Sequence, residues 1–261
     1  MRRLLTAVIL IPLIYLYVMR LPQIYFTALI VVVSLIAQSE FYSMYKLKGA
    51  LKWTALAFGM GAIIAVYQDV SLTDVIMLSV IVIAGLRLLT KKAPGASLYE
   101  VSSLLLGLFY IPLLLSSQIS LRKEGGPEWI MFLYGSVWAS DSLAYYMGTA
   151  FGKRKLYEEV SPNKTEAGAV GSIIGGIGGA VLLRAFFNIQ MPYATTIMAG
   201  AIIGVASVLG DLVESMFKRD AGVKDSGSLI PGGHGGVLDK IDSALFAGTT
   251  LYWMLKAMSV I

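Results

Sequence analysis

The chain has 261 residues, of which 57% are hydrophobic and 14% charged, with a formal net charge of +5 and no cysteine. Soluble domains carry about 25% charged residues, so this composition excludes an ordinary soluble protein. Without cysteine and with one histidine, the chain cannot build disulfides or the usual zinc sites, and any bound metal would be a hard cation on oxygen ligands. The basic excess suits a membrane surface of anionic lipid, and we expect no nucleic-acid partner.

Apolar segments long enough to cross the roughly 30 Å hydrocarbon core recur along the whole length. The sequence therefore predicts an all-α integral membrane protein, a polytopic bundle of about nine transmembrane helices. The predicted spans are Leu4–Met19, Ile24–Tyr45, Leu51–Tyr67, Leu72–Leu89, Leu98–Ile119, Trp129–Met147, Ala167–Phe187, Tyr193–Met216 and Val237–Ile261.

These spans place most lysines and arginines on one side of the membrane. Because such residues collect in cytoplasmic loops, the pattern predicts a cytoplasmic N-terminus and a C-terminus outside. We expect a multi-pass protein of the cell (inner or plasma) membrane whose active site faces the cytoplasm. Residues 1–125 are predicted to form N-terminal transmembrane helices, and residues 126–261 a C-terminal transmembrane catalytic region.

Ionisable residues lie inside two of the predicted spans. "SVWASDSLAYYMG" places Asp141 in the sixth, and "SVLGDLVESMFKRD" places Asp211 and Glu214 near the end of the eighth. Charges within a bilayer are costly and tend to mark functional sites. The i, i+3, i+4, i+7 spacing puts Asp211, Glu214, Ser215 and Lys218 on one helix face. The alternative is a purely structural ion pair between Glu214 and Lys218.

The ninth span opens with "VLDKID", which places Asp239 and Asp242 in its first turn. Acidic residues there complement the helix dipole, which is one explanation. The eighth span ends and the ninth begins on the same side, however, so both acidic pairs are predicted to face each other. A few carboxylate oxygens beside a phosphate are how Mg²⁺ is usually held, and we expect a metal site here.

Between these helices runs "GSLIPGGHGGVLD", a glycine-rich loop that contains His234, Gly235 and Gly236. Glycines allow backbone amides to approach a ligand closely, which favours phosphate binding, although such clusters are more often plain turns. His234 is either a catalytic group or an ordinary loop histidine. Cationic residues flank the loop at Lys218, Arg219 and Lys224.

A second long loop is predicted from Gly148 to Glu166. Its "GTAFGKR" is one residue short of a P-loop and lacks the following Ser or Thr, so that motif is rejected. Its cations Lys153, Arg154, Lys155 and Lys164 nonetheless suit phosphates. The following "GSIIGGIGG" indicates close helix packing rather than nucleotide binding.

"SMFKRDAGVKDSGSLIPGGHGGVLDKIDS" resembles, nearly residue for residue, the signature of the phosphatidate cytidylyltransferases, or CDP-diacylglycerol synthases. "SDSLAYYMGTAFGKRKL", "SPNKT" and "SVLGDLVES" resemble further segments of that family. The resemblance implies that CTP and phosphatidic acid are joined to give CDP-diacylglycerol and pyrophosphate, with Mg²⁺ required. The chain departs from the family at an extra glycine before His234, at Lys240 in place of arginine, and at Asn163.

On this resemblance we expect Asp211 and Asp239 to hold Mg²⁺, with a second cation as an option, and the metal site to include Glu214, Asp225 and Asp242. Further catalytic residues are Lys218, Arg219, Lys224 and His234, and the substrate-binding residues are Asp141, Lys153, Lys164, Ser215, Gly235, Gly236 and Lys240. The expected partners are CTP, phosphatidic acid and membrane lipid, with a homodimer as an option. A CTP-dependent lipid kinase and a secondary transporter are the alternative functions.

Overall fold

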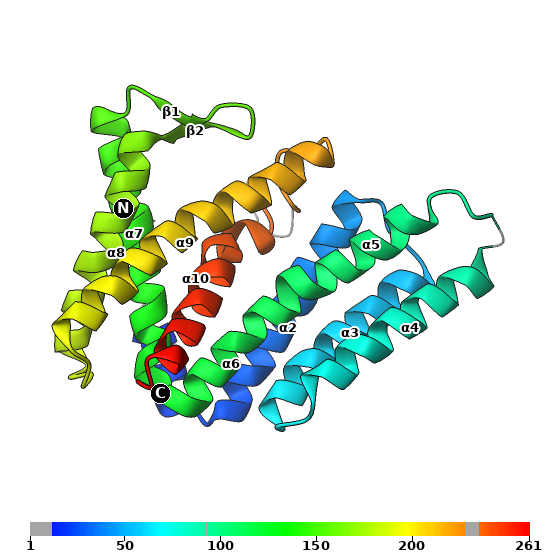
Figure 1. The fold of residues 1–261 in the computed structure, drawn as a ribbon, viewed down its shortest axis with the longest axis horizontal. Helices are drawn as coiled ribbons and strands as arrows, with labels where there is room; N and C mark the ends of the chain where they lie inside the picture. Colours follow the sequence, from blue (N-terminus) through cyan, green and yellow to red (C-terminus); the bar gives the residue numbers. More distant parts are fainter. Residues whose placement is uncertain (1–11, 92, 228–234) are drawn as a thin grey trace.

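The structure is a computed structural model that describes residues 12–91, 93–227 and 235–261, and it consists of helices with one short β-hairpin (Figure 1). Residues 12–20 are helical. The elements that follow are α2 (Gln23–Met44), α3 (Ala50–Tyr67), α4 (Leu72–Thr90), α5 (Ser97–Leu108), η1 (Phe109–Leu113), α6 (Leu114–Gly125), α7 (Pro127–Phe151), β1 (Lys155–Tyr157), β2 (Ser161–Thr165), α8 (Glu166–Phe186), α9 (Tyr193–Asp220) and α10 (Leu238–Ala257).

Among the described residues, six helical segments are long and apolar enough to cross a membrane. They are α2, α3, α4, the continuous run Ser97–Gly125, α8 and α9. The prediction of an all-α membrane protein is therefore confirmed. Helices α7 and α10 lie outside this set, and they are the helices that carry Asp141 and the pair Asp239 and Asp242.

The predicted span Leu98–Ile119 is one helical run with a local distortion. Its middle is the π-turn η1, which contains Pro112. Proline has no N–H to donate, and its ring crowds the preceding turn, so the regular i→i−4 ladder cannot continue through it. The run continues to Gly125 and ends at Gly126, whose φ of +100° breaks the helix before Pro127 starts α7.

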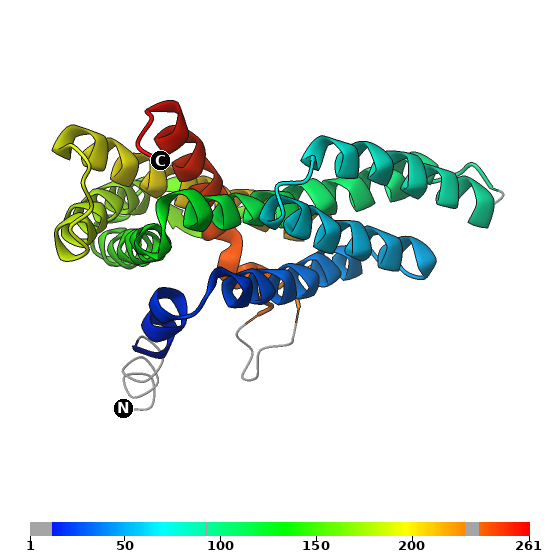
Figure 2. The same ribbon diagram turned by 90° about the horizontal axis from the view of Figure 1, so that it is seen from below.

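Helices α7, α8 and α9 pack against one another on one side of the molecule, with α2 to α6 on the other and α10 between them (Figures 1 and 2). Several glycines of α8 face the backbone of a neighbouring helix directly. A Cβ added at Gly175 would lie 2.5 Å from the Ala139 carbonyl oxygen, and one at Gly171 would lie 2.7 Å from that of Leu143. The predicted packing role of this glycine repeat is confirmed, because any side chain would force the helices apart.

The segment predicted as a loop from Gly148 to Glu166 is more ordered than expected. Helix α7 extends to Phe151, and β1 and β2 form an antiparallel hairpin in which Lys155 pairs with Thr165 and Tyr157 with Ser161. Thr165 then begins α8, since its hydroxyl accepts the N–H of Gly168 at 3.1 Å. The hairpin lies at the same end of the helices as the end of α9 and the start of α10 (Figure 1).

Candidate catalytic site

The end of α9 and the start of α10 meet through Lys218. Its ammonium lies 2.6 Å from Oδ1 of Asp239 and also forms an ion pair with Glu214, one helical turn earlier. Glu214 is fully buried, so the ammonium offsets a charge that would otherwise be costly to bury. The predicted meeting of acidic residues from the two helices is found here, with the cation placed between them.

Asp239 ties the two ends of the glycine-rich loop together. Its Oδ2 accepts the N–H of Ser226 at 3.0 Å, the hydroxyl of Ser226 at 2.8 Å and the N–H of Gly236 at 2.6 Å. Gly235, with φ +77°, takes a backbone conformation that favours glycine, and a Cβ there would lie 2.5 Å from the same Oδ2. Both oxygens of Asp239 are thus engaged by the protein.

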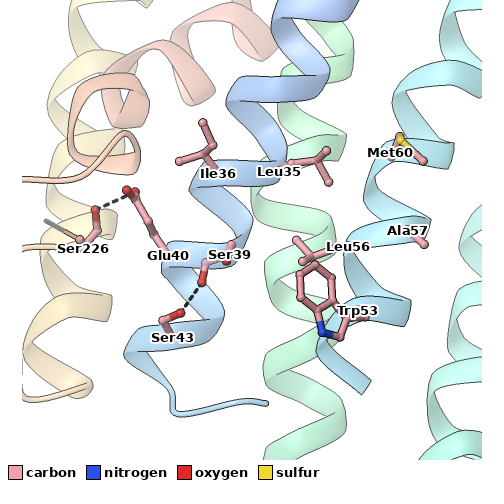
Figure 3. Close-up of a pocket in the computed structure, with 11 residues that line it drawn as sticks. Leu35, Ile36, Ser39, Glu40, Ser43, Trp53, Leu56, Ala57, Met60 and Ser226 are labelled. Atoms are coloured by element: carbon pink, nitrogen blue, oxygen red, sulfur yellow. Dashed lines mark hydrogen bonds between the residues drawn. The ribbon is translucent and has the colours of Figure 1, made fainter. Parts of the chain in front are cut away.

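Glu40 of α2 is a site residue that the sequence analysis missed. Its side chain is buried and reaches the start of α10, where Oε1 accepts the N–H of Val237 at 3.0 Å and Oε2 accepts that of Leu238 at 2.9 Å. Its Oε2 also lies 3.3 Å from the Ser226 hydroxyl (Figure 3). The available signal was an ionisable residue inside a predicted span, Ile24–Tyr45, which marks functional positions in membrane proteins.

A second group of carboxylates lies beside this one and is drawn from α7, α9 and α10. Lys164, at the end of the hairpin, places its ammonium 2.7 Å from Oδ2 of Asp211, and Ser215 donates to Oδ1 of Asp211 at 3.3 Å. Asp141 and Asp242 are close enough to Asp211 and to Lys164 to interact with both electrostatically. Three carboxylates therefore gather around one lysine, and this group contains Asp141 and Asp211, two of the three acidic residues predicted within the bilayer.

The structure distributes the predicted metal ligands over these two groups. Asp211 and Asp242 lie in the Lys164 group, Glu214 and Asp239 lie in the Lys218 group, and Asp225 is exposed in the segment after α9. Within the described ranges, no three acidic or histidine side chains form a ready-made metal cage. Glu214 interacts electrostatically with both Asp239 and Asp242, so the two groups are neighbours.

The remaining predicted cations surround these carboxylates. Arg219 donates to the carbonyl of Val160 at 3.3 Å and to that of Val223 at 3.0 Å, which joins α9 to the hairpin. Lys153 is exposed and lines a shallow cavity of about 290 Å³ next to Arg154 and Glu166. Lys224 and Lys240 are exposed as well. His234 lies outside the described residues.

The family model described as the cytidylyltransferase family matches residues 1–258. This chain belongs to that family. It is 32% identical to a phosphatidate cytidylyltransferase of Bacillus subtilis (strain 168) over 99% of this chain and 98% of the relative. A phosphatidate cytidylyltransferase of Synechocystis is 34% identical over 88% of each chain. One of Haemophilus influenzae is 50% identical over 44% of this chain and 41% of the relative.

The site of this family member combines carboxylate oxygens, lysine and arginine side chains, and glycine backbone that packs closely against the carboxylates. These groups lie at one end of the helices. Such an arrangement can neutralise a nucleoside triphosphate on one side and accept a phosphate carried by a lipid on the other. Both charge types are already paired in this structure, Lys164 with Asp211 and Lys218 with Asp239. Anionic ligands can therefore recruit the lysines, while a bound cation can recruit the carboxylates.

Proposed function

We propose that this chain transfers the cytidylyl group of CTP to phosphatidic acid, giving CDP-diacylglycerol and pyrophosphate. The observation that carries the proposal is the full-length match to a relative named phosphatidate cytidylyltransferase, 32% identical over 99% of this chain. The placement of paired carboxylates and lysines at the ends of apolar helices supports it, because a lipid phosphate and a soluble nucleotide can meet only at the membrane's edge.

In this reaction an oxygen of the phosphatidic acid phosphate bonds to the α-phosphorus of CTP. The bond from that phosphorus to the oxygen bridging to the β-phosphate breaks, and pyrophosphate leaves with the electron pair. A phosphate monoester has a second pKa near about 6, so the attacking group is mostly dianionic at neutral pH and needs no strong base. The protein's contribution is then positioning and charge neutralisation.

We assign the cationic role to the lysines and arginine around the two carboxylate groups. Lys164, Lys218, Arg219 and Lys224 would contact phosphates, with Lys153 and Lys240 at the exposed rim. Gly235 and Gly236 would let backbone approach the nucleotide, and Ser215 would hold Asp211 in place. His234 is retained as a candidate catalytic residue on the family signature alone.

The residues present fit Mg²⁺ as the metal ion. The donor set consists of carboxylate oxygens, the ligands a hard cation prefers, and Mg²⁺ typically uses one or two carboxylates together with waters and substrate phosphates rather than a complete protein cage. Asp211, with Asp141 and Asp242 beside it, offers such a partial set of carboxylate ligands. Asp239 would contribute a further carboxylate oxygen once the Lys218 ammonium leaves it to bind a phosphate. Glu214 and Asp225 are proposed as nearby support. The metal would supply charge neutralisation on the triphosphate.

The topology proposed for this reaction has about nine spans, a cytoplasmic N-terminus and an external C-terminus, in the cell membrane. The basic ends of the helices then face the cytoplasm, where CTP is found. A homodimer and a second cation stay predictions.

The test uses the purified protein in detergent with CTP labelled in the cytosine ring, phosphatidic acid and MgCl₂. We expect a lipid-extractable cytidine product and one pyrophosphate for each product molecule. Release of CDP with a phosphorylated lipid would instead identify a lipid kinase. Absence of any labelled lipid across several detergents and metal concentrations would refute the proposal.

A further inference from the structure

A groove with a volume of about 850 Å³ lies between α2 and α3 and reaches the glycine-rich loop (Figure 3). Its walls are mostly apolar and include Leu35, Ile36, Leu56, Ala57 and Met60. Both helices are among those long and apolar enough to cross a membrane. The volume of the groove falls within the roughly 300–1,000 Å³ of small-molecule sites. Its walls are formed by helices that can cross a membrane, so we expect a lipid ligand.

The polarity of the groove changes along its length. Ser43 and Trp53 lie at one end and Leu35 and Met60 at the other (Figure 3). The eight helical steps from Leu35 to Ser43 span about 12 Å at about 1.5 Å per step, less than half of the hydrocarbon core. Trp53 is 70% exposed at the polar end, where indole rings commonly sit at the membrane interface.

Polar groups close this end of the groove. Lys52 places its ammonium 3.0 Å from the Ser43 hydroxyl and 3.2 Å from the Ser39 carbonyl, which leaves a cation at the rim. Ser226 and Gly227, at the start of the glycine-rich loop, form part of the lining, and the Ser226 hydroxyl also donates to Asp239. The lining of the groove therefore includes both the apolar residues of α2 and α3 and the start of the glycine-rich loop.

We propose that this groove holds the part of one acyl chain of phosphatidic acid that lies next to its head group. The inference rests on the proposed function. An apolar chain suits Leu35, Ile36 and Met60, while Lys52 and the serines lie at the level of the glycerol and phosphate. Since a chain leaving bilayer lipid gains little from the hydrophobic effect, the groove acts by close packing, which positions the phosphate beside the loop.

Filling the groove tests this assignment through the two substrates separately. Ala57→Trp and Met60→Trp place a large ring in the groove, and Leu182→Trp on α8, whose leucine is 72% exposed and lies away from the groove, is the matched control. We expect the KM for phosphatidic acid to rise about tenfold, equivalent to about 1.4 kcal/mol, in both groove variants. The KM for CTP should stay within about twofold, and Leu182→Trp should match the wild type. Unchanged values in all three variants would overturn the assignment.

A photoreactive phosphatidic acid with a diazirine near the head-group end of one chain gives a readout that does not need turnover. We expect the wild type to be labelled on α2 and α3 at the groove, with unlabelled phosphatidic acid competing and Ala57→Trp reducing the label. Labelling that is spread over all lipid-facing helices and is not reduced by the competitor would overturn the assignment of the groove. Because this result is obtained on the wild type, it also decides the question if a groove variant alters both KM values or unfolds. If the proposed reaction itself were wrong, the wild type would make no cytidine-linked lipid whatever the labelling pattern.

Discussion

Glu40 offers the sharpest test of how the site is built, because one side chain from α2 holds the start of α10. Glu40→Ala removes a buried carboxylate that accepts two backbone N–H groups, from Val237 at 3.0 Å and from Leu238 at 2.9 Å. Hydrogen bonds to charged groups contribute about 1.5–3 kcal/mol each, so the pair is worth about 3–6 kcal/mol. The cost of burying the carboxylate opposes this figure, which is therefore an upper value.

We expect Glu40→Ala to lower kcat/KM by at least about 100-fold, or about 2.7 kcal/mol, since the loop ends and Asp239 lose a shared anchor. Glu40→Gln keeps one accepting oxygen and should fall between Glu40→Ala and the wild type. The assay is initial-rate formation of lipid-linked cytidine over a range of CTP concentrations, with thermal unfolding measured on the same preparations.

The matched control is Asp69→Asn, which removes the same charge from an exposed ion pair with Lys123 and keeps a residue type that tolerates the φ of +58° at this position. Such a surface pair is worth about 0–1 kcal/mol, and its loss should leave activity unchanged. If Glu40→Ala kept kcat/KM within about twofold of the control at an unaltered melting temperature, Glu40 would not position the loop.

Three further results are expected. Asp211→Asn should lower kcat at least about 100-fold, the scale of losing a charge-stabilising group, with a melting temperature close to wild type; near-normal turnover in a folded variant would exclude Asp211 as a metal ligand. Gly236→Ala should destabilise the protein by about 1–3 kcal/mol, because the added methyl overlaps Glu40 and Ser226; a melting temperature equal to wild type would contradict this packing. EDTA should abolish turnover and MgCl₂ should restore it, whereas full activity in excess chelator would remove the metal from the proposal.

Much of the site could be predicted because its residues lie close together along the chain. Asp211, Glu214, Ser215 and Lys218 share a face of α9 by helical spacing alone, and the structure places Glu214 and Lys218 in an ion pair and Ser215 against Asp211. That ion pair is also the structural alternative considered for these residues, and the structure shows it joined to Asp239. Local periodicity was sufficient here, since a helix fixes which neighbours share a face.

The hairpin β1–β2 was not predicted, because its strands leave almost no pattern in the sequence. Its strands have three and five residues, too short to show an alternating pattern, and they are flanked by charged residues typical of loops. Only the packing of the segment against the end of α9, through Arg219 and Val160, brings Lys164 to Asp211.

By itself, the sequence determined the class of the molecule, the approximate bounds of its long helices, the glycine packing of α8 and the family signature. These depend on composition and on spacing within single helices, which a linear pattern records directly. The tertiary structure alone decided that Glu40, 198 positions from Leu238, anchors the start of α10, and that the acidic residues divide between Lys164 and Lys218. Such contacts depend on how separate helices cross and which faces they present, and no local pattern in the chain specifies them.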